Sequence, residues 1–103
     1  MGAFVYMLRC ADASYYVGVA TGEDLTKRVT EHQIGAYPGS YTYSRRPVEL
    51  VWSDHFDRIT DAIAAERQVK GWSRAKKQAL INGKWNLIHQ LAKRRGGRPK
   101  PRP

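Results

Sequence analysis

The chain has 103 residues, which is enough for one small domain and too few for two. Hydrophobic residues make up 42% of it, so a modest core can form, and no stretch approaches the roughly 20 apolar residues of a membrane span. The formal net charge of +9 favours a polyanionic partner, above all nucleic acid, over a surface that is merely cationic.

The first half of the chain is predicted to form a hairpin followed by a helix. β-branched and aromatic residues predict strands over residues 3–9 and 15–20, joined by a turn at residues 11–14. Cys10 is the only cysteine and reads as a small core residue. Because no secretory pattern opens the chain either, we expect a cytoplasmic protein. A helix is predicted over residues 24–33, ended by a glycine.

The second half is predicted to hold one strand and three helices. After a loop at residues 35–46, these are a strand at 48–53 with Phe56 as its extension, and helices at 60–70, 73–82 and 86–94. Thr60 and Ser73 are the candidate N-caps of the first two helices. Residues 96–103 offer no apolar side chain to bury and are predicted to be a disordered basic tail.

The order of these elements, β-β-α-β-α-α-α, indicates a small α+β domain over residues 1–95. Its sheet is expected to pack helices on one or both faces.

Glu66 is the most informative single residue. It lies three residues after Ile63 and three before Val69, so its carboxylate is expected on the apolar face of the predicted helix. A partly desolvated carboxylate is unfavourable unless it meets a cation or a metal ion. Arg67 or Lys70 could supply the cation, and an ordinary ion pair at the rim agrees equally well with this position.

Arg28 and His32 are four residues apart, so they share one side of the first predicted helix. There an arginine can present its planar fork to a phosphate and a neutral histidine can accept a proton, although spacing alone favours a solvated face with a rim histidine. Tyr6 and Tyr16 fall on adjacent strands, where tyrosines usually pack in the core. A phenol has a pKa near 10 and needs nearby positive charge, or a metal-bound water, to act as a base.

Two basic stretches suit nucleic acid. One interleaves hydroxyls, aromatic rings and arginines, and the other precedes a helix N-terminus, where amide groups can also meet phosphate. The candidate nucleic-acid-binding residues are Tyr41, Thr42, Arg45, Arg46, Lys70, Arg74, Lys76 and Lys77. A basic surface that only keeps the protein soluble is the alternative, and we favour nucleic acid. A membrane partner is disfavoured, because the sequence contains no basic amphipathic helix with a large aromatic face.

Taken in order, these residues resemble the motifs of the GIY-YIG endonuclease superfamily, in particular its small stand-alone bacterial members. The resemblance covers about residues 3–82 and implies a three-stranded antiparallel sheet flanked by helices. Phe4 stands where the family name has glycine. The matching segments are Phe4-Val5-Tyr6, Tyr16-Val17-Gly18, Leu25-x-x-Arg28-Val29-x-x-His32, Tyr41-Thr42 with Ser44 to Leu50, and Ala62-x-x-x-Glu66-x-x-x-Lys70 with Trp72 to Lys77.

The resemblance implies hydrolysis of DNA phosphodiester bonds with one divalent ion, Mg²⁺ or Mn²⁺. Glu66 matches the metal ligand, and Tyr16 matches the tyrosine that helps to deprotonate the attacking water. Arg28 matches the residue that stabilises the pentacovalent phosphate, while Tyr6 and His32 match supporting positions. We expect structure-selective or nonspecific cleavage, with branched or single-stranded DNA as the substrate, RNA as a further candidate, and a role in DNA repair or recombination.

Two other functions remain open. A nucleic-acid-binding module that keeps the fold without efficient catalysis predicts salt-sensitive affinity that survives Glu66→Ala and needs no metal. An interaction protein whose basic face contacts a repair partner predicts no nucleic-acid binding at physiological salt. The combination of Tyr16, Arg28 and Glu66 favours the enzyme, because binding alone needs no buried carboxylate.

Overall fold

In a computed structural model of the chain, residues 2–22 and 24–83 are described. The chain divides into two compact units, residues 1–71 and 72–103, and each is described by itself. The predicted helix at 86–94 and the predicted basic tail at 96–103 lie outside the described residues. No helix in the described part of the chain is long and apolar enough to cross a membrane.

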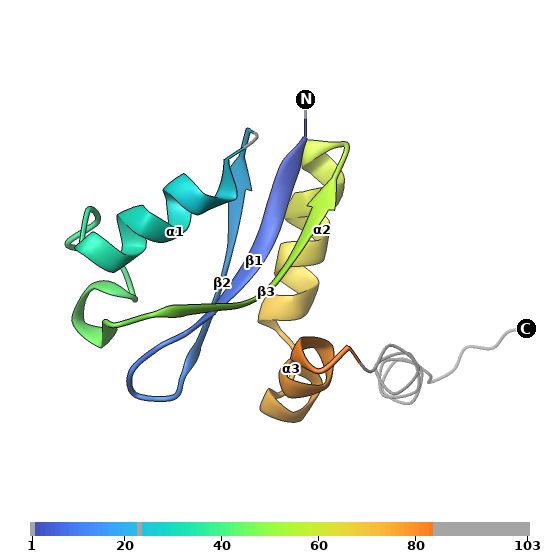
Figure 1. Cartoon of the computed structure of the whole chain (residues 1–103). Helices are drawn as coiled ribbons and strands as arrows, with labels where there is room; N and C mark the ends of the chain where they lie inside the picture. Colours follow the sequence, from blue (N-terminus) through green and yellow to red (C-terminus); the bar gives the residue numbers. More distant parts are fainter. Residues whose placement is uncertain (1, 23, 84–103) are drawn as a thin grey trace, which may run out of the picture. The chain divides into compact units, whose positions relative to one another are not determined.

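The first unit is built on one three-stranded antiparallel sheet (Figure 1). The strand order is β2-β1-β3, so the predicted hairpin forms, β1 is the central strand and β2 is an edge strand. This architecture confirms the predicted α+β fold, including the extension of the third strand to Phe56. In chain order the elements are β1 (Ala3–Arg9), β2 (Tyr15–Thr21), α1 (Leu25–Ile34), the 3₁₀ helix η1 (Tyr43–Arg45), β3 (Glu49–Phe56) and α2 (Ile59–Lys70).

Side chains of the central strand are buried on both faces of the sheet. Tyr6 and Leu8 lie on one face, in a core cluster that includes apolar residues of α1. Val5 and Met7 are also fully buried, and because side chains alternate along a strand they point to the opposite face, where α2 packs against β1 and β2. The two helices therefore cover different faces and both lie over the hairpin (Figure 1).

Local signals fix both ends of α1. The carboxylate of Asp24 accepts a hydrogen bond of 3.0 Å from the backbone N–H of Lys27, which caps the first turn. Gly35 ends the helix in the left-handed conformation, with φ of 77°, which glycine adopts without a steric penalty. The observed span is within one residue of the prediction at each end.

The start of α2 corrects the predicted N-cap. Arg58, not Thr60, occupies the cap position and makes no side-chain capping hydrogen bond. The first turn instead contains Asp61, whose negative charge is favourable near the positive end of the helix dipole. Thr60 is thus already inside the helix.

The buried face of α2 also differs in part from the prediction. Ala62 and Val69 are buried, whereas Ile63 is 38% exposed and does not belong to the packed face. The packed face therefore runs through Ala62, Glu66 and Val69, which are four and three residues apart. Glu66 keeps its predicted place on this face, with different neighbours.

The loop from α1 to β3 is held at both ends. The Gln33 side chain donates to the Val48 carbonyl at 2.7 Å and accepts from the Val48 N–H at 2.9 Å. Near the middle, Arg46 Nε donates to the Tyr43 carbonyl at 2.8 Å. The segment predicted as a loop thus contains the short helix η1.

The described part of the second unit contains α3 (Arg74–Ile81). Ser73 is its N-cap and accepts a 3.2 Å hydrogen bond from the Lys76 N–H, which confirms that predicted cap. Lys76 is only 4% exposed, and its ammonium lies 5.4 Å from the ring centroid of Trp72. This arrangement satisfies the charge partly through the aromatic ring.

Candidate active site

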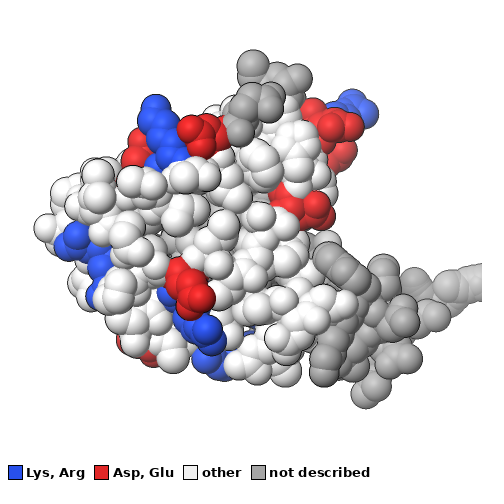
Figure 2. Space-filling model, in the orientation of Figure 1, with Lys and Arg blue, Asp and Glu red and all other residues white. Residues whose placement is uncertain are grey.

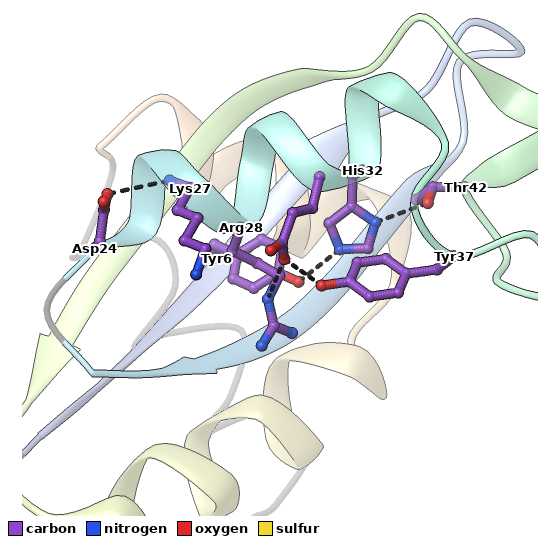
Figure 3. Close-up of polar contacts among 8 residues, drawn as sticks. Tyr6, Asp24, Lys27, Arg28, His32, Tyr37 and Thr42 are labelled. Atoms are coloured by element: carbon purple, nitrogen blue, oxygen red, sulfur yellow. Dashed lines mark hydrogen bonds and ion pairs between the residues drawn. The ribbon is translucent and has the colours of Figure 1, made fainter.

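His32 lies at the centre of a buried chain of hydrogen bonds (Figure 3). Its Nε2 is 2.8 Å from the Tyr6 hydroxyl, and its Nδ1 is 2.8 Å from the Thr42 hydroxyl, which is 3.1 Å from the hydroxyl of Ser40. His32 is only 3% exposed, so the rim position that spacing alone favoured was wrong. Because both ring nitrogens have protein partners, His32 orients Tyr6 and does not meet solvent directly.

Burial keeps both members of the Tyr6–His32 pair uncharged at neutral pH. Burial, and then the positive charge of Arg28, lowers the pKa of His32, while Glu31 opposes the shift. Burial, and then the neighbouring Tyr16, raises the pKa of Tyr6, while Arg28 opposes it. The resting pair is therefore a neutral imidazole and a protonated phenol, which suits a supporting role better than that of a general base.

The two hairpin tyrosines pack over Gly18. Gly18 lies directly opposite Tyr6 in the sheet, and a Cβ at this position would lie 2.7 Å from the Tyr6 hydroxyl and 2.9 Å from Cε2 of Tyr16. The Tyr16 ring is half-buried, with its centroid 5.2 Å from that of His32 and 6.2 Å from that of Tyr6. Because Gly18 has no side chain, the rings of Tyr6 and Tyr16 can both pack directly against its backbone.

Arg28 lies beside this aromatic group and is held by two neighbours. Its Nε is 3.6 Å from Oε1 of Glu31, and its guanidinium carbon is 5.8 Å from the ring centroid of Tyr37 (Figure 3). The Tyr37 hydroxyl donates to the same Glu31 oxygen. Because the ion pair engages the Nε edge of the guanidinium, the Nη1–Nη2 edge is the one suited to bidentate contact with a phosphate.

A shallow pocket of about 130 Å³ opens next to Arg28. It brings two basic and two acidic side chains together at the beginning of α1. Its lining residues are Ala20, Thr21, Asp24, Lys27, Arg28 and Glu31.

Glu66 meets a cation of its own helix. Its side chain is 14% exposed, and its Oε2 lies 2.9 Å from Nζ of Lys70, whose side chain is 61% exposed. The hydrogen bond with Glu66 is the main cause of the raised pKa of Lys70, and the Tyr16 phenol adds a smaller effect in the same direction. Of the partners considered from sequence, Lys70 is therefore the one that pairs with Glu66.

Electrostatic interactions connect charged groups of both helices to the hairpin tyrosines. The positive charge of Arg28 in α1 opposes the rise in the pKa of Tyr6, and the Tyr16 phenol contributes to the raised pKa of Lys70 in α2. Although α1 and α2 cover opposite faces of the sheet, both contribute charge near these two rings. Of the five residues predicted as catalytic, Tyr6, Tyr16, Arg28 and His32 lie together, and Glu66 is linked to Tyr16 only through its ion-pair partner Lys70.

The predicted nucleic-acid-binding residues divide by exposure. Thr42 is fully buried and Lys76 nearly so, which makes direct contact of either side chain with nucleic acid a wrong prediction. In the face drawn in Figure 2, acidic and basic side chains lie close together and form no continuous basic patch. The remaining predicted residues are exposed (Tyr41, Arg46, Lys70, Arg74) or partly exposed (Arg45, Lys77).

Sequence reasoning missed Glu31 and Tyr37, which hold Arg28. Glu31 follows Arg28 by three residues, a spacing at which helical side chains meet, so this ion pair could have been predicted from the sequence. Tyr37 carries no comparable signal, because its contact depends on the path of the loop after α1.

The donor set around Glu66 fits a loosely held divalent ion better than a preformed cage. Among residues 2–22 and 24–83, no three His, Cys, Asp or Glu side chains converge as metal ligands. Mg²⁺ commonly binds through one or two carboxylates together with water and substrate phosphate oxygens. A single carboxylate such as Glu66 is compatible with that mode of binding.

Comparison with known proteins shows which family the chain is similar to. The family model of the GIY-YIG catalytic domain matches residues 2–79. A UPF0213 protein of Natronomonas pharaonis is 42% identical over 78 residues, which cover 76% of this chain and 88% of that protein. A UPF0213 protein of Staphylococcus saprophyticus is 39% identical over 79 residues, which cover 77% and 93%.

A solved structure agrees with the fold as well. The solution NMR structure of a UPF0213 protein from Bacillus halodurans is similar with a TM-score of 0.52 and 36% identity, over 80% of this chain and 84% of that one. The chain belongs to the GIY-YIG family of nuclease domains.

Proposed function

We propose that this protein is a metal-dependent endonuclease that hydrolyses DNA phosphodiester bonds. The observation that carries the proposal is that Arg28 of α1 interacts electrostatically with Tyr6, and Lys70 of α2, the partner of Glu66, with Tyr16, whose ring centroid is 6.2 Å from that of Tyr6. An arginine fork, a carboxylate and a phenol are the groups needed to hold a phosphate, a cation and an attacking water.

Arg28 binds the scissile phosphate through its Nη edge and offsets the charge that develops on the phosphorus oxygens. Tyr16, the less buried of the two hairpin tyrosines, orients the attacking water through its hydroxyl oxygen and receives its proton. To accept that proton, Tyr16 must be in its phenolate form. Tyr6, whose hydroxyl is hydrogen-bonded to His32, packs against the Tyr16 ring and holds it in place.

Glu66 is the proposed ligand of a divalent ion, Mg²⁺ or Mn²⁺, whose remaining positions are filled by water and substrate. When bound there, such an ion stabilises charge on the phosphate and on the leaving oxygen. For this to occur, Lys70 must release the Glu66 carboxylate, and its exposed side chain can turn to solvent because a lysine stem has several rotatable bonds.

The proposed substrate is branched or single-stranded DNA, with RNA as a second candidate. Support comes from the net charge of +9 and from the exposed ring of Tyr43, beside which the guanidinium of Arg46 lies. Arg46, Lys70 and Arg74 are exposed and are the proposed phosphate contacts. We further propose a cytoplasmic role in DNA repair or recombination.

One observation favours a second function. Because Lys70 already neutralises Glu66, the carboxylate is satisfied without a metal, as a domain that only binds nucleic acid would require. A binding module predicts salt-dependent affinity that is the same with and without a divalent ion.

The test is incubation of the purified protein with supercoiled, single-stranded and branched DNA in Mg²⁺, Mn²⁺ or EDTA. Glu66→Gln is compared with Glu49→Gln, which removes the same charge at an exposed pair with Arg9. Metal-dependent cleavage that is lost in Glu66→Gln and kept in Glu49→Gln would support the endonuclease. Binding without cleavage in every condition would favour the binding module.

A further inference from the structure

We propose that Asp12, Arg45 and Tyr41 form a brace that positions Tyr16, so that Arg45 acts within the protein and not on the phosphates of nucleic acid. The proposal rests on the function proposed above, because positioning Tyr16 matters only if Tyr16 takes part in cleavage. It assigns a role to the β1–β2 turn, which otherwise has no part in the site.

Arg45 joins two loops that are far apart in sequence. Its Nε donates to Oδ2 of Asp12 in the hairpin turn at 3.1 Å, and its Nη1 donates to the carbonyl of Tyr41 at 2.7 Å. A backbone hydrogen bond of 2.8 Å from the N–H of Ala11 to the Arg45 carbonyl strengthens the same junction. Side chain and backbone of Arg45 therefore fasten the loop after α1 to the turn between β1 and β2.

The brace continues from Arg45 to Tyr16 through aromatic contacts. The guanidinium carbon of Arg45 lies 3.8 Å from the ring centroid of Tyr41. The Tyr41 ring is stacked on that of Tyr16, with centroids 6.2 Å apart and an interplanar angle of 20°. This separation is within the range of offset-stacked aromatic pairs.

Tyr16 needs such support because it lies on an edge strand. The rings of Tyr6 and His32 contact it from the core side, at 6.2 and 5.2 Å between centroids. Tyr41 supplies a further wall from the loop, and a small rotation of the ring would move its hydroxyl away from a bound phosphate. Displacing a reacting group by about 1 Å can reduce the rate of catalysis about a hundredfold.

The charges at the brace disfavour a direct phosphate contact by Arg45. Asp12 is held ionised, because hydrogen bonds from Ser14, and to a lesser degree Arg45, lower its pKa. A phosphate approaching this guanidinium would also approach the Asp12 carboxylate, which is half exposed. Two of the three guanidinium nitrogens already donate to protein oxygens.

The experiment compares Arg45→Gln and Asp12→Asn with Arg9→Gln and Glu49→Gln. The second pair is a matched control, because Arg9 and Glu49 form an exposed arginine–carboxylate pair of 3.5 Å elsewhere on the sheet. The first measurement is NMR of the tyrosine rings in the free protein, which needs no activity. The brace predicts that the Tyr16 ring resonances shift in Arg45→Gln and Asp12→Asn and stay in place in both controls.

The second measurement separates turnover from binding. The brace predicts that kcat falls about threefold to tenfold in Arg45→Gln and in Asp12→Asn, and no further in the double variant, because both changes break one connection. Asp12→Asn is the sharper test: removal of a negative charge alone would tighten DNA binding and leave or raise the rate. Arg45→Gln is expected to change the salt dependence of DNA binding no more than Arg9→Gln does.

Unchanged Tyr16 resonances in both brace variants would overturn the proposal, whether or not the wild type cleaves DNA. A salt slope reduced by about one in Arg45→Gln alone would also overturn it, because that is the signature of a lost phosphate contact. If the wild type shows no cleavage under any metal, the proposed function fails, and shifted Tyr16 resonances would still establish the brace.

Discussion

Replacing Gly18 with alanine should destabilise the protein. The new Cβ would lie 2.7 Å from the Tyr6 hydroxyl, 2.8 Å from Cζ of the same ring and 2.9 Å from Cε2 of Tyr16. Tyr6 is 1% exposed and hydrogen-bonded to His32, so it has no free space into which to move.

The magnitude follows from two terms. Overpacking of a filled site costs about 1–3 kcal/mol, and displacement of the Tyr6 hydroxyl loses a hydrogen bond of about 0.5–1.5 kcal/mol. Alanine recovers roughly 0.4–1 kcal/mol by restricting the unfolded chain. We therefore expect a net loss of about 0.5–4 kcal/mol, centred near 2 kcal/mol, in the free energy of unfolding. Cleavage should also fall, because Tyr6 and Tyr16 are both displaced.

The assay is urea denaturation followed by circular dichroism, with Gly39→Ala as the matched control. Gly39 has no heavy atom within 4 Å of an added Cβ, so that variant should be as stable as the wild type or up to about 1 kcal/mol more stable. A Gly18→Ala protein within about 0.5 kcal/mol of Gly39→Ala would refute the packing argument, since ordinary surface substitutions stay within that range.

Three further predictions follow from the buried network and from the Glu66–Lys70 pair. Burial lowers the pKa of His32 below its ordinary value of 6.5, so below that pH the unfolded chain binds a proton that the folded protein does not, and the free energy of unfolding should fall as the pH drops. Urea denaturation of the wild type between pH 7.5 and 5 should show this fall, and the pH dependence should be weaker in His32→Gln. Thr42→Val should lose about 1–2 kcal/mol in the same assay while Thr42→Ser stays close to the wild type, because only serine keeps a hydroxyl for His32 Nδ1; equal loss in both would contradict the role of the hydroxyl. Lys70→Gln should lower the Mg²⁺ concentration for half-maximal cleavage about twofold, since an exposed i,i+4 ion pair contributes about 0.3–0.5 kcal/mol; an increase would show that Lys70 assists catalysis more than it competes.

The fold was largely predictable because its signals are local. Period-two patterns and turn residues define the hairpin, and Ser73 caps its helix through a hydrogen bond to a residue three positions away. Thr60 failed as a cap because a capping residue is chosen by where the preceding strand ends, and β3 runs on to Phe56. Ile63 failed because the direction in which α2 packs is set by the sheet and not by the helix sequence alone.

The site was predictable in composition but not in depth. The positions of Tyr6 and Arg28 followed from motif spacing, whereas the burial of His32 depends on how α1 and the later loop close over the hairpin. Thr42 looked like a surface hydroxyl because its sequence neighbours are polar and basic, yet it turns inward to meet His32. Such a contact joins elements that sequence periodicity treats separately.

The hydrogen-bond chain through His32 has a consequence for how the protein is made. Tyr6 and His32 are 26 residues apart and His32 and Thr42 a further 10, and the carboxylate of Glu66 comes later still. Each connection closes a loop at an entropic cost that only the complete sheet unit offsets. A chain still emerging from the ribosome, or one cut by a protease within this span, would lack the assembled site. The proposed nuclease would thus become capable of damaging DNA only after folding is finished.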